Sequence, residues 1–284
     1  MFIPPMLPVE HPHPFDDERY IFEPLIDGHR LILAMEKGVV RLFTRHGRDI
    51  TDQYPELHPV PVLDNSDIVL DGEACCIDPV TGKIDRDAAL DRCKLTKPLS
   101  IREASVRNPA HYIVFDILRY RGRDVRSLAL SERKKLLGEV LEANRSISPA
   151  VGVEYSGVAL FEALRSNGLG GVVAKRKTSE YVGGAKDPSW LIVPDYDYTV
   201  VQIAGYRKHR FGWLVKHRDR IAGVLEHGIP SAHQNAFLGV SRKLATHEDR
   251  DFVYVDPAIH ARVRHRKWTR DGLLRKPEFV DFVV

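Results

Sequence analysis

The chain has 284 residues, with 42 Lys and Arg against 39 Asp and Glu, 43% apolar residues and 29% charged ones. This composition excludes disordered and fibrous proteins, and a net charge of +3 does not by itself indicate a nucleic-acid binder. Three cysteines cannot build a disulfide framework, and the sequence has neither a membrane-length apolar run nor a signal-peptide pattern. We therefore expect a soluble cytoplasmic protein.

The charge is unevenly divided along the chain. From Asp195 onward there are sixteen Lys and Arg against eleven Asp and Glu, a net of +5, whereas residues 1–194 carry a net of −2. The change falls where the apolar string Trp190-Leu191-Ile192-Val193 meets Pro194, and proline interrupts regular structure. We therefore predict two domains, residues 1–194 and residues 195–284.

The first part mixes strands and helices. Arg30–Met35 and Val39–Thr44 are β-rich runs, and the Glu36-Lys37-Gly38 segment between them predicts a hairpin. Ile68–Ile77 and His111–Tyr120 have the apolar content of buried strands.

Two helices follow in this part. Ser131–Asn144 is a predicted helix, with Ser131 as its N-cap and an apolar face that includes Leu136 and Val140. Val158–Ser166 predicts a shorter helix, closed by Asn167-Gly168 and followed by a strand over residues 171–175.

The last ninety residues have a different pattern. Short strands are predicted at regular spacing, and one helix interrupts them at about Gln234–Leu244. Several short strands with one helix favour a small barrel. The predicted strands are Tyr198–Tyr206, Phe211–His217, Arg220–His227 and Phe252–Val255.

Five short strings in the first part carry candidate chemistry. Each alone is weak, since Asp27-Gly28 by itself is more typical of a turn with solvated flanks. In the third string Phe115 and Asp116 point to opposite faces of their strand, so one of them can line a site while the other is structural. The strings are Phe22-Glu23-Pro24-Leu25-Ile26-Asp27-Gly28-His29-Arg30, Ile68-Val69-Leu70-Asp71-Gly72-Glu73, Tyr112-Ile113-Val114-Phe115-Asp116-Ile117-Leu118, Gly170-Gly171-Val172-Val173-Ala174-Lys175 and Trp190-Leu191-Ile192-Val193.

The order and spacing of these strings resemble the nucleotidyltransferase motifs of ATP-dependent DNA ligases, especially the compact two-domain bacterial and prophage type. The likeness runs over both parts of the chain and includes Thr44-Arg45-His46-Gly47 and the segment Gly272–Phe279 near the end. It implies an α+β fold: a nucleotidyltransferase (ATP-grasp-like ligase adenylation) domain followed by a C-terminal OB-fold barrel.

The resemblance also implies a reaction and its site residues. A lysine attacks the α-phosphate of ATP, AMP passes to the 5′-phosphate of a nick, and the 3′-hydroxyl then seals the strand, with Mg²⁺ as the metal. By resemblance Glu23 would recognise the adenine amino group, Phe115 would stack on the ring and Arg30 would hold the ribose. Glu73 would serve the ribose hydroxyl or a metal, Lys175 belongs to the cofactor-binding set, and Arg45 would hold the 5′-phosphate of the nick.

The sequence departs from the family at the positions that perform the chemistry. Leu25 stands where the family has its nucleophilic lysine, and no lysine lies among residues 1–36. Gly170 stands at the metal-binding glutamate, while Ile192 and Pro194 replace two lysines that neutralise ATP phosphates. Leucine has no lone pair and cannot form a phosphoramidate, so we expect no catalytic residue to be intact and no self-adenylylation.

The segment His260–Lys276 is strongly basic, with seven Lys and Arg against one acid. Arg262, Arg264 and Arg266 alternate, so on a strand they share one face. A solvated barrel face would explain this pattern, but with the ligase likeness we favour contacts to the DNA backbone. The predicted DNA-binding residues are Arg45, Arg262, Arg264, Arg266, Lys267 and Arg275.

The leading hypothesis is a monomeric, ligase-like protein that binds nicked double-stranded DNA and weakly binds nucleoside, without membrane association. Two alternatives stay open. One is an active ligase that borrows another lysine, such as Lys175 or Lys177, and the other is a non-catalytic adenylate sensor that uses Glu23, Phe115 and Arg30.

Overall fold

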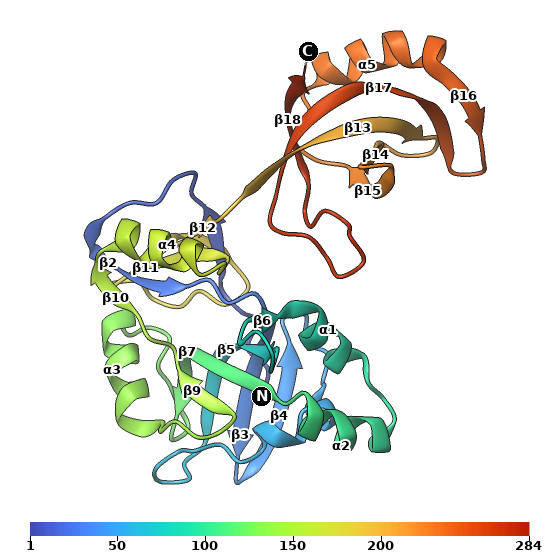
Figure 1. The fold of residues 1–284 in the computed structure, drawn as a ribbon. Coiled ribbons are helices and arrows are strands. Elements are labelled where there is room, and N and C mark those ends of the chain that lie inside the picture. The colour runs from blue at the N-terminus through green and yellow to red at the C-terminus, as the bar shows by residue number, and fades with distance from the viewer. Residues whose placement is uncertain (284) are drawn as a thin grey trace. The chain divides into compact units, whose positions relative to one another are not determined.

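The computed structural model describes residues 1–283 and contains two compact units, Met1–Pro194 and Asp195–Val284 (Figure 1). Among the described residues, no helix has both the length and the apolar character needed to cross a membrane.

The first unit contains two antiparallel-rich sheets, and the first of them has the order β1-β12-β11-β2-β10. One face of this sheet is covered by α4 (Gly157–Ser166), whose Phe161 and Leu164 pack on Val172 and Val193 (Figure 1). The strands are β1 (Leu7–Glu10), β2 (Asp17–Pro24), β10 (Val153–Tyr155), β11 (Gly171–Arg176) and β12 (Lys186–Pro194).

The second sheet has the order β4-β3-β5-β7-β8, with β6 beside β5 and β9 beside β7. Its outer face forms the largest core, into which α3 (Leu130–Val140) contributes Leu137 and Val140. The 3-10 turns Thr51–Gln53 and Pro55–Leu57 and the helices α1 (Arg86–Lys94) and α2 (Pro98–Arg107) complete this side. The strands are β3 (His29–Glu36), β4 (Val39–Thr44), β5 (Ile68–Ile77), β6 (Ile84–Asp85), β7 (Ala110–Tyr120), β8 (Arg123–Asp124) and β9 (Ile147–Pro149).

A separate apolar cluster joins the two sheets of the first unit. Trp190 of the first sheet packs in it together with Ile32 and Val69 of the second, and Phe115 lies at its margin. The inner faces of both sheets therefore converge on the same region, and the candidate site lies there.

The second unit is a barrel. Its order is β15-β14-β13-β17-β16, and β18 pairs with the second half of β17. A parallel bridge between His227 and Glu278 joins the far edges. Trp213, Phe237 and Phe279 fill the interior. The elements are β13 (Asp197–Arg207), β14 (Trp213–His217), β15 (Arg220–Leu225), α5 (Ser231–Leu244), β16 (Ala245–Glu248), β17 (Phe252–His265) and β18 (Glu278–Val283).

Most predicted elements are confirmed, and three predictions need correction. Ser131 does not cap its helix: α3 begins at Leu130, the N-cap is Ala129, and Glu132 Oε2 accepts a hydrogen bond from the Ala129 amide at 3.0 Å. The helix also ends at Val140 and not at residue 144. The strand predicted at Phe252–Val255 continues to His265, because its second half pairs with both β13 and β18.

Candidate functional site

The inner face of the first sheet aligns three rows of side chains. Glu23 on β2 and Ile192 on β12 both lie opposite Val173 on β11, and Lys175 lies opposite Trp190. Paired residues on neighbouring strands share a face, and so do residues two apart on one strand. Glu23, Lys175, Trp190 and Ile192 therefore belong to one surface, called the site face below.

The motif positions that the sequence predicts to be replaced belong to the same surface. Leu25 is two residues beyond Glu23, and its amide donates to the Gly171 carbonyl at 2.9 Å. Pro194 lies opposite Gly171, so Leu25, Ile192 and Pro194 all lie on the site face. Gly170 adjoins them, since a Cβ built on it would lie 3.7 Å from the Leu25 carbonyl oxygen.

Glu23 is held between two lysines. Its carboxylate is 2% exposed, and Oε2 lies 2.7 Å from Lys175 Nζ while Oε1 pairs with Lys134 of α3. Burial opposes the charge, but the two ammonium groups prevail and lower the pKa of Glu23. Burial also lowers the pKa of Lys175 to about 8, against the attraction of Glu23.

Aromatic rings surround the Lys175 ammonium group. Nζ lies 4.0 Å from the centre of the Phe115 ring and 4.3 Å from that of Trp190. The Arg30 guanidinium lies 4.7 Å from the same Phe115 ring. The ring predicted to stack on adenine is thus in contact with two cations, which its negative faces attract.

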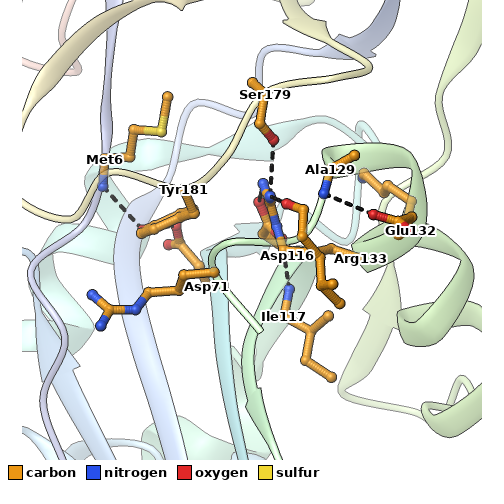
Figure 2. Close-up of polar contacts among 12 residues, drawn as sticks. Met6, Asp71, Asp116, Ile117, Ala129, Glu132, Arg133, Ser179 and Tyr181 are labelled. Atoms are coloured by element: carbon orange, nitrogen blue, oxygen red, sulfur yellow. Dashed lines mark hydrogen bonds and ion pairs between the residues drawn. The ribbon is translucent and has the colours of Figure 1, made fainter. Parts of the chain in front are cut away.

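Arg30 is tied into a buried network that joins both sheets. Its guanidinium binds Asp71 through two hydrogen bonds of 2.7 and 2.6 Å and also donates to the Met6 carbonyl at 3.0 Å. Tyr181 closes the network: its hydroxyl donates to Asp71 at 2.6 Å and accepts the Met6 amide at 3.0 Å (Figure 2). Arg30 is therefore fixed in orientation at the inner face of the second sheet.

The prediction that Phe115 and Asp116 point to opposite sides is wrong, because the pairing of β7 with β5 shifts register at Phe115. Val114 and Ile117 both pack in the core of the outer face, so Phe115 and Asp116 between them lie on the inner face. Asp116 receives two hydrogen bonds from the fully buried Arg133, at 2.8 and 2.9 Å, and Arg133 also donates to the Ser179 carbonyl (Figure 2). Such a buried, bidentate pair is structural, since all its polar groups are satisfied inside the fold.

Glu73 differs from the other acids of the region. It lies opposite Arg30 on the neighbouring strand, yet among residues 1–283 it makes no ion pair or hydrogen bond. Burial raises its pKa to about 8; the charge of Arg30 counteracts this effect, and that of Asp71 adds to it. A carboxyl group with this pKa keeps its proton at neutral pH.

A group of arginines surrounds the start of β3. Burial lowers the pKa of His29 to about 4, and the charges of Arg86, Arg45 and Arg48 lower it further. Arg45, the residue predicted to hold a 5′-phosphate, is exposed, and its Nε donates to His46 Nε2 at 2.9 Å. These three arginines give this edge of the first unit a positive field.

The predicted basic stripe of the barrel follows β17. Ala261, Val263 and His265 are buried, so Arg262 and Arg264 point to the other side. Arg264 binds Glu278 at 2.5 Å and lies 4.5 Å from the centre of the Tyr196 ring. Beyond the strand, Arg266, Lys267 and Arg275 lie in the β17–β18 hairpin, with Lys267 Nζ 3.5 Å from Asp195.

Sequence reasoning missed two groups in the site. Lys134 lies one residue after the structural Arg133 on α3, where a solvated lysine is the ordinary expectation, and its partner Glu23 is 111 residues away. Tyr181 lies in the segment between β11 and β12, which has no local motif. No signal in the sequence links either residue to the site.

Comparison with known proteins places these features in a family. The model of the ATP dependent DNA ligase domain matches residues 8–193. The SPbeta prophage-derived DNA ligase-like protein LigB of Bacillus subtilis strain 168 is 32% identical over 284 residues, covering 100% of both chains. The multifunctional non-homologous end joining protein LigD of Mycobacterium bovis is 29% identical; the match covers 91% of this chain and 35% of LigD.

Solved structures agree with the sequence matches. The ligase domain of M. tuberculosis LigD aligns with a TM-score of 0.59 at 25% identity, covering 99% of this chain and 95% of that one. A structure of a Lig E DNA ligase aligns with a TM-score of 0.68 at 13% identity, covering 98% and 99%, which shows a common fold alone. The expected fold class, an adenylation-type domain with a C-terminal OB-fold barrel, is confirmed.

Proposed function

The chain belongs to the family of ATP-dependent DNA ligases, and from that premise we propose that it is a ligase-like protein that binds nicked duplex DNA without charging itself with AMP. One observation carries the proposal: Leu25, at the position of the family's nucleophile, shares the site face with Ile192 and Pro194. Three replaced positions in one surface indicate a single altered region of the site.

The chemistry at this end of the site supports the proposal. A phosphoramidate needs a nitrogen lone pair, and Leu25 supplies only a branched hydrocarbon. A triphosphate needs cations or amide donors, and neither Ile192 nor the imide nitrogen of Pro194 provides one. Leu25, Ile192 and Pro194, at this end of the site face, therefore do not fit the phosphates of ATP.

The residues also fit a catalytic Mg²⁺ poorly. Mg²⁺ is usually held by one or two carboxylates together with phosphates, and Gly170 contributes no carboxylate. Glu73 keeps its proton at neutral pH, so a cation would have to displace that proton before binding. Among residues 1–283, no three His, Cys, Asp or Glu side chains gather as metal ligands do.

The nucleoside end of the site fits its proposed ligand better. Glu23 and Phe115 both contact the ammonium group of Lys175. The buried Trp190 Nε1 has no hydrogen-bond acceptor among the described residues. An unsatisfied buried donor is costly, and a nucleoside would offer it an acceptor. Because Lys175 and Arg30 already contact the Phe115 ring, we propose weak nucleoside binding that has to displace at least one of them.

Lys175 is the strongest candidate for a substitute nucleophile, since its pKa of about 8 leaves a fraction of neutral amine. However, Lys175 lies four residues beyond Gly171 on β11, and Gly171 is the residue to which Leu25 is hydrogen-bonded. At the rise of a strand that separation is about 13 Å, longer than a lysine side chain. An α-phosphate poised for position 25 would therefore lie out of reach of Lys175.

Incubation with α-labelled ATP and Mg²⁺ tests the proposal directly. We expect no covalent protein–AMP adduct with the natural chain, and an adduct would refute the proposal. If an adduct forms, its loss in Lys175→Arg or in Lys177→Arg would identify the borrowed lysine.

Restoration provides the positive control. The combined variant Leu25→Lys, Gly170→Glu, Ile192→Lys and Pro194→Lys should form the adduct and seal nicks. The matched control carries Leu25→Arg with the other three changes, which restores the charge but not the nucleophile. Nick-binding by the natural chain, measured with labelled duplexes, tests the DNA half of the proposal, and absence of binding would refute it.

A further inference from the structure

The β17–β18 hairpin, residues 266–277, is a well-ordered projection of the barrel. Thr269 donates its amide to Leu273 at 2.8 Å and accepts the Gly272 amide at 3.0 Å, which closes a tight turn with Gly272 at a φ of +76°. The Leu274 amide donates to Ala222 of β15 at 2.7 Å. The hairpin is therefore anchored to the barrel, and its tip extends beyond the strands (Figure 1).

An aromatic platform lies beside this tip. Trp268 is 36% exposed, and its ring centre lies 5.3 Å from those of both His217 and His265. Leu273, which follows the turn, is 39% exposed. The two histidines support the indole from the protein side, so its conformation is preorganised while part of its surface stays accessible.

The surroundings of Trp268 are positively charged. The hairpin contains five basic residues and only one acid, and the adjacent β14–β15 turn presents the exposed Arg218 and Arg220 on either side of Asp219. The basic residues of the hairpin are Arg266, Lys267, Arg270, Arg275 and Lys276. An aromatic ring among cations matches a nucleic-acid strand, in which bases and phosphates alternate. The loop between the fourth and fifth strands is one of those through which OB-folds contact oligonucleotides.

We propose that Trp268 stacks on a nucleobase exposed at the nick, with Leu273 as an apolar wedge beside it, so that the hairpin distinguishes interrupted from intact duplex. The inference rests on the proposed binding of nicked DNA. Inserting an apolar side chain requires unstacking a base step, which costs a few kcal/mol in an intact duplex. At a nick one strand is already broken, so the same contact forms at lower cost.

Tryptophan fluorescence reports this contact in the natural chain. The protein has three tryptophans, of which Trp190 and Trp213 are 1% and 2% exposed. Stacking on a base should therefore quench Trp268 alone. We expect nicked duplex to quench a larger share of the emission than intact duplex of the same sequence, both at saturation.

Variants separate stacking from general affinity. Trp268→Ala should lose about 5- to 150-fold in affinity for nicked duplex, the range of one base–aromatic stack, with little change for intact duplex. Trp268→Phe should restore part of the preference because it keeps a ring. Phe211→Ala, which removes an aromatic side chain of similar exposure (39%) in another turn of the same unit, should leave the ratio of the two affinities unchanged.

The outcomes separate the two proposals. If the natural chain prefers nicked duplex and Trp268→Ala keeps the same preference, the stacking inference is wrong while the proposed function stands. The stacking inference is also overturned if intact and nicked duplex quench the emission equally and Trp268→Ala loses equal affinity for both. The indole would then contact both duplexes in the same way and would not distinguish the nick. If the natural chain binds neither duplex, both proposals fail.

Discussion

Replacing Glu73 by glutamine should stabilise the protein above pH 8 and change its stability little below pH 4.5. The reason is the pKa of Glu73, which burial raises from the ordinary value of 4.5 to about 8. In the unfolded chain the carboxyl group ionises near its ordinary value, whereas in the folded protein it keeps its proton until about pH 8. Between these values the folded state binds more protons, so the free energy of unfolding falls as the pH rises.

The size of the effect follows from the interval between the two pKa values. Each pH unit of that interval corresponds to ~1.4 kcal/mol, which sets an upper limit of about 5 kcal/mol above pH 8. Glutamine has the same shape and cannot ionise, so the variant does not suffer this loss. The difference between variant and natural protein should therefore be near zero at pH 4 and grow to several kcal/mol by pH 9.

Urea denaturation at pH 4, 6, 7 and 9 measures the difference. Glu139→Gln is a suitable control, because that side chain is 58% exposed and its distance of 4.0 Å from Lys135 indicates a weak surface pair. The control should show little pH-dependent difference. A Glu73→Gln effect of equal size at every pH, or one that favours the natural protein at pH 9, would refute the argument that the partly buried Glu73 lacks an ionic partner.

Three further predictions concern the fold and the DNA surface. Arg133→Met should lower the free energy of unfolding by about 3–5 kcal/mol, because it leaves Asp116 buried without its partner, and unchanged urea denaturation would contradict this. Gly28→Ala should destabilise the chain, since a Cβ would lie 2.3 Å from the Ala74 carbonyl oxygen, whereas Gly170→Ala, with its nearest contact at 3.7 Å, should be tolerated; equal melting temperatures would argue against the packing. Affinity for nicked duplex should fall at least about tenfold from about 50 to about 200 mM salt, as two released counterions already require, and a flat salt dependence would exclude a backbone-phosphate interface.

The elements that sequence reasoning predicted well have their signal in neighbouring residues. Ile68–Ile77 is observed with the predicted bounds because a continuous apolar run between turns is a local property of a buried strand. The predicted start of α3 is wrong by one residue, because the Glu132 side chain accepts a hydrogen bond from the Ala129 amide. A capping serine and a reciprocal glutamate compete for the same helix end, and sequence alone does not say which prevails.

The length of β17 depended on partners that are distant in the chain. Asp256 and Pro257 interrupt the apolar pattern, so the sequence predicted a strand that stops at Val255. In the structure the pairing with β13 shifts register across this segment, and residues beyond it pair with both β13 and β18. Proline is tolerated in such an irregularity because no ladder hydrogen bond is needed there.

The site shows the same division between local and distant information. Resemblance to a family drew attention to Glu23, Phe115 and Arg30, and the structure brings all three to the facing sides of two sheets. It could not indicate that Lys134 and Lys175 share the Glu23 carboxylate, because that contact depends on how α3 packs against the sheets. Pairings between segments over a hundred residues apart leave no periodic pattern in a single sequence.

Charge on the site face links the replaced residues to the stability of the fold. Glu23 balances the buried Lys175 and the partly buried Lys134, so the cluster already carries one net positive charge. Lysines at positions 25, 192 and 194 would add three cations to the same face, and a glutamate at position 170 would offset only one of them. In an active enzyme the phosphates of a bound nucleotide would complete the balance, so such a site is most stable when occupied. The apolar residues found here remove that dependence, which is the physical reason that the proposed loss of the chemistry is compatible with an intact fold.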